Sequence, residues 1–179
     1  MDISKLPASI VSQLGGAVEA YILGSRKKYL ATAGSLTPAQ KKSMQPFFDR
    51  QILDQVRVLV LNGSRVEDPP FYAMAKMMGI RNLPSFANVA AVTFVDVVVS
   101  HEPFSESLLF HELVHVVQYA QMGSREFAAR YVQGFLKNGS YDEIPLEKNA
   151  CELEGRFSSK NATFSVAEEV RSWSEAGKL

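Results

Sequence analysis

Two histidines and a glutamate in the stretch LLFHELVHVVQYAQMG, residues 108–123, have the spacing of a metal-binding helix. His111 and His115 are four residues apart, so on a helix their rings emerge about 40° apart and one turn along. Two imidazoles in this arrangement can reach one tetrahedral metal ion. Glu112 projects about 100° away from His111, close enough to touch a metal-bound water without being a ligand. The HExxH pattern therefore predicts one zinc ion in a site that hydrolyses peptide bonds.

Two other interpretations of this stretch compete with a zinc enzyme. The first is a metal-free apolar helix with two incidental histidines, in which three polar groups lie among leucine, valine and phenylalanine side chains. Burying such groups unpaired costs roughly 1–3 kcal/mol each, and a bound metal removes that cost, so the zinc interpretation is favoured. The second keeps the zinc in a catalytically silent interaction or scaffold domain. Glu112 favours the enzyme, because a structural site does not need it.

A catalytic zinc ion has three protein ligands and one open position. The remaining histidine, His101, precedes the motif by ten residues, and Gln118 and Gln121 occupy the glycine and histidine positions of the longer metzincin motif. The third ligand is therefore expected to be a carboxylate. Glu147 is the best candidate, because it lies in the first turn of a predicted helix, and small Ala150 one turn later would let this helix approach the motif helix closely.

The segments HELVH and PLEKNA together resemble the gluzincin class of zinc metallopeptidases. TFVDVVV…LLFHELVHVVQY…IPLEKNACELE is similar, over roughly residues 55–157, to a group of small bacterial HExxH domains with a HELVHVxQ core. The resemblance implies a zincin-like fold around an HExxH active-site helix. It also implies that His111, His115 and Glu147 are the ligands of one zinc ion and that Glu112 is the general base.

The chain departs from the gluzincin pattern at Cys151. Thermolysin-like members place an aspartate there, four residues after the third ligand, where it orients a liganding histidine. We expect Glu154 or a backbone carbonyl to orient the histidine instead, or the metal to be held more weakly. Glu154 is also an alternative ligand. Cys151 itself is expected to be a small buried residue and not a nucleophile.

Peptide hydrolysis needs further groups around the zinc ion. Zinc would polarise the carbonyl and lower the pKa of its water, while Glu112 takes a proton and passes it to the leaving amine. His101 and Tyr141 are candidate catalytic donors to the oxyanion. Their competing interpretations are an exposed loop histidine and a packing aromatic. Tyr119 lies on the histidine side of the motif helix but is expected to belong to the core.

The elements that position these residues predict an α+β fold, mainly helical with a small central sheet. Helices are expected over residues 4–33, from Thr37, within 68–79, and over 105–123, 125–137, 145–157 and 164–174. Strands are expected at 56–61 and 92–99, with Asp96 indicating an edge or partly exposed strand. The free edge of the 92–99 strand, VTFVDVVV, would bind an extended substrate.

Length and composition predict a single domain, residues 1–179. It divides into an N-terminal helical segment (1–54), a small sheet region (55–104) and a metal-binding helical region (105–179). The first segment could cover the cleft and keep an enzyme latent. The formal net charge is zero, which gives no electrostatic reason to expect nucleic acid or a membrane as a partner. The HExxH motif makes a peptide or protein substrate the expected partner. No signal-peptide or membrane-spanning pattern is present, and a cytoplasmic location is expected.

Overall fold

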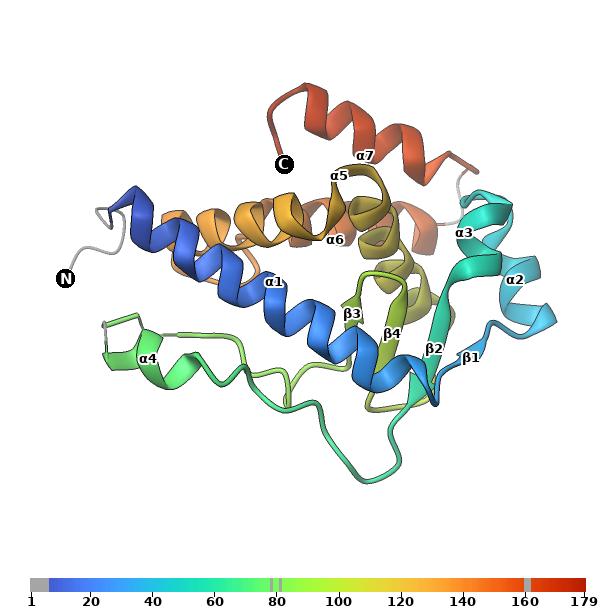
Figure 1. The fold of residues 1–179 in the computed structure, drawn as a ribbon. Coiled ribbons are helices and arrows are strands. Elements are labelled where there is room, and N and C mark those ends of the chain that lie inside the picture. Colours follow the sequence, from blue (N-terminus) through green and yellow to red (C-terminus); the bar gives the residue numbers. More distant parts are fainter. Residues whose placement is uncertain (1–6, 78, 81, 160–161) are drawn as a thin grey trace.

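The computed structural model describes residues 7–77, 79–80, 82–159 and 162–179. Its elements follow in the order α1 (Ala8–Leu30), β1 (Gly34–Ser35), α2 (Pro38–Met44), α3 (Arg50–Gln55), β2 (Arg57–Val60), α4 (Tyr72–Met77), β3 (Ala91–Phe94), β4 (Val97–Ser100), α5 (Glu106–Asn138), α6 (Pro145–Ser159) and α7 (Val166–Glu175). The α+β prediction, with helices before and after a small sheet, is confirmed (Figure 1). Residues 4–6 of the first predicted helix lie outside the described residues.

The four strands form one mixed sheet in the order β1-β2-β4-β3. β2 and β4 are parallel, whereas β1 pairs with β2 and β3 pairs with β4 in antiparallel fashion. β4 is buried along its whole length. In this order β3 forms one edge of the sheet, and in the part of the chain that the structure describes no strand pairs with its outer side.

The prediction of one continuous strand over residues 92–99 is wrong. The segment is a hairpin, because Val95 has φ +63° and turns the chain between β3 and β4. A positive φ is costly for a β-branched residue, so a turn at Val95 was not expected from the sequence VTFVDVVV. Asp96 marks this turn, not an exposed edge: its carboxylate accepts two hydrogen bonds from the Arg26 guanidinium of α1. Of the two strands of this hairpin, β3 lies at the edge of the sheet, whereas β4 pairs with β2 and β3.

The two helices predicted over 105–123 and 125–137 occur as α5, which changes direction at Gly123 (φ +77°, ψ 164°). The Ser105 hydroxyl caps the first turn by accepting a hydrogen bond from the Leu108 backbone N–H at 3.1 Å. The Ser124 hydroxyl, at the start of the second part, donates a hydrogen bond to Glu19 of α1. The first half of α5 thus runs past the sheet, and the second half runs back along α1 (Figure 1).

Close packing joins α5 to α6. The Ala150 side chain is fully buried, as the expected close approach of the two helices requires. A Cβ placed on Gly134 of α5 would lie 2.7 Å from Pro145 Cδ, so only glycine fits there.

The N-terminal helix is part of the core. α1 packs on the second half of α5, where Leu14 and Ile22 join a buried cluster with Tyr119 and Phe127. Removing residues 1–50 would therefore expose core side chains. Among the described residues, no helix has the length and apolar character needed to cross a membrane.

Candidate metal centre

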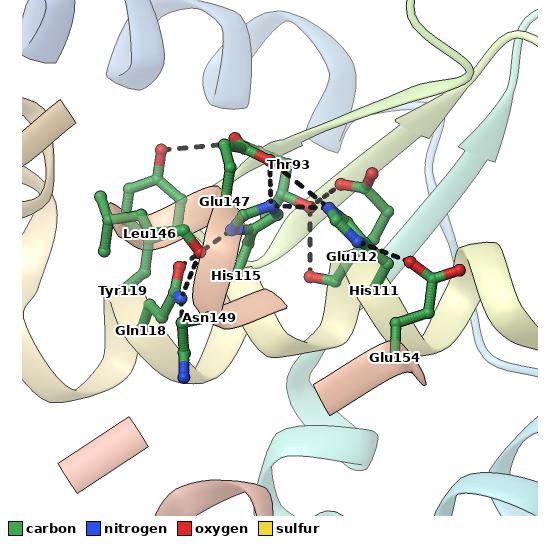
Figure 2. A network of polar contacts seen from close by, with 10 residues as sticks. All are labelled: Thr93, His111, Glu112, His115, Gln118, Tyr119, Leu146, Glu147, Asn149 and Glu154. Atoms are coloured by element: carbon green, nitrogen blue, oxygen red, sulfur yellow. Dashed lines mark hydrogen bonds and ion pairs between the residues drawn. The ribbon is translucent and has the colours of Figure 1, made fainter. Parts of the chain in front are cut away.

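The structure brings the three expected metal ligands together (Figure 2). His111 and His115 project from the first half of α5, and Glu147 projects from the first turn of α6. The two Nε2 atoms are 3.2 Å apart. Glu147 Oε2 lies 3.5 Å from His111 Nε2 and 3.4 Å from His115 Nε2.

These three atoms fit a tetrahedral metal ion. Zinc–ligand bonds of 2.0–2.1 Å place neighbouring donor atoms of a tetrahedron about 3.3–3.4 Å apart. The three separations of 3.2, 3.4 and 3.5 Å match one face of such a tetrahedron. Two imidazoles and a carboxylate suit zinc, and they also suit other divalent transition metals. Three protein donors leave the fourth position open, as in catalytic sites.

The far side of each imidazole is held by a hydrogen-bond acceptor. His111 Nδ1 lies 3.0 Å from Glu154 Oε2, and His115 Nδ1 lies 2.9 Å from Gln118 Oε1. The Gln118 amide nitrogen faces two acceptors, the Leu146 carbonyl and Asn149 Oδ1, each at 3.0 Å. Its Oε1 therefore faces His115, whose Nδ1 must donate.

With both Nδ1 atoms donating, each Nε2 of the neutral rings presents a lone pair toward Glu147. Glu154 thus orients His111, which was one of the alternatives expected in the absence of a carboxylate at Cys151.

Burial makes the cluster depend on compensating positive charge. Burial alone would raise the pKa of Glu147, but the charges and hydrogen bonds of His115 and His111 outweigh it and lower that pKa. Burial lowers the pKa of His111, but hydrogen bonds to Cys151, Glu147 and Glu154 outweigh it and raise the pKa to about 12. Without a metal ion, protons on the histidines balance Glu147. A divalent cation would replace those protons.

The side chain of Glu112 lines the same cavity as His115 and Glu147 of the cluster. It is 5% exposed, and its Oε2 accepts a hydrogen bond of 2.6 Å from Thr93 Oγ1 on the edge strand β3. Its second oxygen has no hydrogen-bond partner among the described residues. Thr93 therefore fixes one carboxylate oxygen and leaves the other available to accept a proton.

The cavity beside the cluster is small and mainly apolar. Its volume is about 100 Å³, below the 300–1,000 Å³ typical of ligand pockets. Side chains from α1, β3, both halves of α5 and the segment around α4 enclose it; they include Leu14, Ile22, Tyr72, Leu83, Phe86, Val92, Phe127 and Phe135. A space of this size accommodates a side chain or a few water molecules.

Both Tyr141 and Tyr119 line this cavity. Burial and the neighbouring Glu147 carboxylate raise the pKa of Tyr141 well above its ordinary value, so its phenol stays protonated and can donate. Tyr141 therefore presents a hydrogen-bond donor to the cavity beside Glu147. Tyr119 is buried and stacks on Phe127, as expected of a core residue, with its hydroxyl 3.5 Å from the Thr93 carbonyl oxygen.

The structure does not bring His101 to the cluster. Its Nε2 accepts a hydrogen bond from the Val66 backbone N–H at 2.9 Å, and its Nδ1 contacts the Val89 carbonyl at 2.6 Å. Both ring nitrogens are therefore occupied by backbone groups. His101 thus joins two loop segments to the end of β4. This structural role explains the position of its side chain without a catalytic role.

The expectation that Cys151 is buried is wrong. The thiol is exposed, because the residue lies about 100° round the helix from buried Ala150. It nevertheless approaches His111 and Glu154. Sequence reasoning also missed the supporting roles of Gln118 and Thr93. The available signal was their polarity within otherwise apolar segments.

No protein-family model, curated protein or solved structure matches this chain. What the chain does has therefore to be inferred from the chemistry of the site.

Proposed function

We propose that this protein is a zinc-dependent metallopeptidase in which Glu112 is the general base. One observation carries the proposal. The Nε2 atoms of His111 and His115 and Oε2 of Glu147 converge as three electron-pair donors, and the Glu112 carboxylate lines the adjoining cavity. Structural zinc sites are closed by four protein ligands, whereas three donors leave room for water or substrate.

The residues of the chain have separate roles in this reaction. A bound zinc ion supplies Lewis acidity, which polarises a carbonyl group and acidifies water. Glu112, held through Oε2 by Thr93, accepts the proton of the attacking water and delivers it to the leaving amine. The Tyr141 phenol donates a hydrogen bond to the developing oxyanion. The free edge of β3 pairs with the main chain of an extended peptide.

A second candidate function is a catalytically silent, zinc-stabilised scaffold. The size of the cavity favours it, because about 100 Å³ does not admit a peptide without movement of the surrounding segments. In that case zinc contributes folding free energy and nothing else. The buried Glu112 carboxylate favours the enzyme, since a scaffold gains nothing from a second buried acid beside Glu147.

Glu112→Gln separates the two functions. For the peptidase, hydrolysis of a mixed peptide library falls by about 10²–10⁴-fold, while zinc content measured by mass spectrometry stays unchanged. Glu102→Gln is the matched control, because Glu102 is an exposed glutamate outside the cavity. A scaffold predicts no effect of Glu112→Gln and a loss of stability in His111→Ala. Zinc-loaded wild-type protein that cleaves no member of the library would refute the peptidase.

A further inference from the structure

His111 belongs to two groups of possible ligands. Through Nε2 it faces His115 and Glu147, and its Nδ1 faces Glu154. A ligand atom of His111, the Cys151 sulfur and a Glu154 carboxylate oxygen all lie within 4.8 Å of one another. We propose that these three residues form a second metal site, which binds a thiophilic divalent cation such as Cd²⁺ or excess Zn²⁺.

The spacing along α6 explains why the two groups share one histidine. Glu147, Cys151 and Glu154 follow one another at i, i+4 and i+7, so they lie on one side of the helix. His111 of α5 faces this side, since it contacts both Glu147 and Glu154. Glu147 at the start of α6 meets the ring from one side, and the two later residues meet it about one to two turns further along.

The second group opens to solvent, whereas the first opens to the cavity. Glu112, His115 and Glu147 line the cavity, and among the described residues its lining does not include Cys151 or Glu154. Cys151 is exposed, and the Glu154 side chain is 32% exposed. A cation can therefore reach the second group without passing through the cavity.

The donor set selects the class of cation. A thiolate, an imidazole nitrogen and a carboxylate suit zinc and softer ions, whereas magnesium and calcium take oxygen ligands. Binding releases two protons, one from the Cys151 thiol and one from His111 Nδ1. When both sites are filled, His111 bridges the two cations as an imidazolate. Because Glu154 then ligates a cation, it no longer accepts the His111 Nδ1–H hydrogen bond of 3.0 Å.

Filling the second site is expected to disturb the first. His111 loses Glu154, the hydrogen-bond acceptor that orients its ring. The second cation also lies only one imidazole ring away from the first. Excess zinc should therefore inhibit the enzyme through Cys151. This consequence rests on the proposed function, whereas the binding site itself does not.

Titration of metal-free protein with Cd²⁺ tests the site directly. Only the second group contains sulfur, so the ultraviolet charge-transfer band of a cadmium thiolate reports on it alone. Wild type should develop the band to saturation at one thiolate per chain, and Cys151→Ser should not. Glu154→Gln and His111→Ala should each weaken the binding seen in this band by at least tenfold. Glu147→Gln, which alters only the first group, should keep the band.

Two results would overturn the proposal. One is a wild-type protein that shows no thiolate band although circular dichroism reports a folded chain. The other is undiminished affinity in both His111→Ala and Glu154→Gln, which would mean that Cys151 binds cadmium alone. In a peptide-cleavage assay, excess zinc should inhibit wild type and spare Cys151→Ser. If no form of the protein cleaves peptides, the peptidase fails while the cadmium titration still decides the second site.

Discussion

Gln118→Leu removes the hydrogen bonds that hold His115 while it keeps the size of the buried side chain. Gln118 is fully buried, accepts from His115 Nδ1 and donates to Asn149 Oδ1. The substitution leaves these two buried groups without partners, at a cost of about 1–3 kcal/mol each. The Leu146 carbonyl, its third contact, keeps its place in the α6 ladder. We expect the free energy of unfolding of the metal-free protein to fall by about 2–6 kcal/mol.

Zinc affinity should fall in the same variant, because the freed His115 ring no longer presents Nε2 toward Glu147. Loss of such a supporting hydrogen bond typically weakens metal binding 10–100-fold. Urea denaturation of chelator-treated protein measures the stability, and competition with a chromogenic chelator measures the affinity. Gln121→Leu is the matched control, since Gln121 is an exposed glutamine of the same helix, and should cost under about 1 kcal/mol. A Gln118→Leu protein within 1 kcal/mol of wild type and with unchanged zinc affinity would refute this reasoning.

Two further predictions follow from charge and from packing. His111 has a pKa raised from 6.5 to about 12, so its contribution to metal-free stability is complete below pH 6.5 and is lost as pH rises toward 12. Glu147 has a lowered pKa, so its contribution is lost as pH falls below 4.5. In thermal unfolding measured as a function of pH, the metal-free protein should become less stable above pH 6.5. Its stabilisation by added zinc should grow over the same range, because zinc needs deprotonated ligands. Parallel stability curves with and without zinc would contradict this. Gly134→Ala should destabilise by about 1–3 kcal/mol, because its Cβ would lie 2.7 Å from Pro145 Cδ. Gly155→Ala, in an open part of α6, should be neutral or stabilising; equal effects of the two substitutions in urea denaturation would refute the packing argument.

The parts of the site that depend on local spacing could be predicted from the sequence. The i, i+4 relation of His111 and His115 needs only a helix, and the apolar run around them predicts one. Glu147 could be chosen because Pro145 begins a helix and Ala150 permits close packing. Each of these inferences depends on residues within two turns of one another.

The parts that depend on long-range contacts could not be predicted. The hydrogen bond from Thr93 to Glu112 requires the sheet to lie beside α5, and no local pattern fixes that arrangement. Val95 adopts a left-handed backbone conformation at the turn between β3 and β4. The adjacent Asp96 forms an ion pair with Arg26 of α1, which is distant in the sequence. The sequence alone leaves His101 available to donate a hydrogen bond. In the structure both of its ring nitrogens contact backbone groups of loop segments.

X-ray absorption at the zinc edge tests the central claim most directly. Protein loaded with one equivalent of zinc should show nitrogen and oxygen scatterers at about 2.0–2.1 Å and no sulfur at about 2.3 Å. That result is expected if His111, His115 and Glu147 bind the ion. Failure to retain one zinc ion per chain, or a sulfur scatterer at one equivalent, would contradict the account.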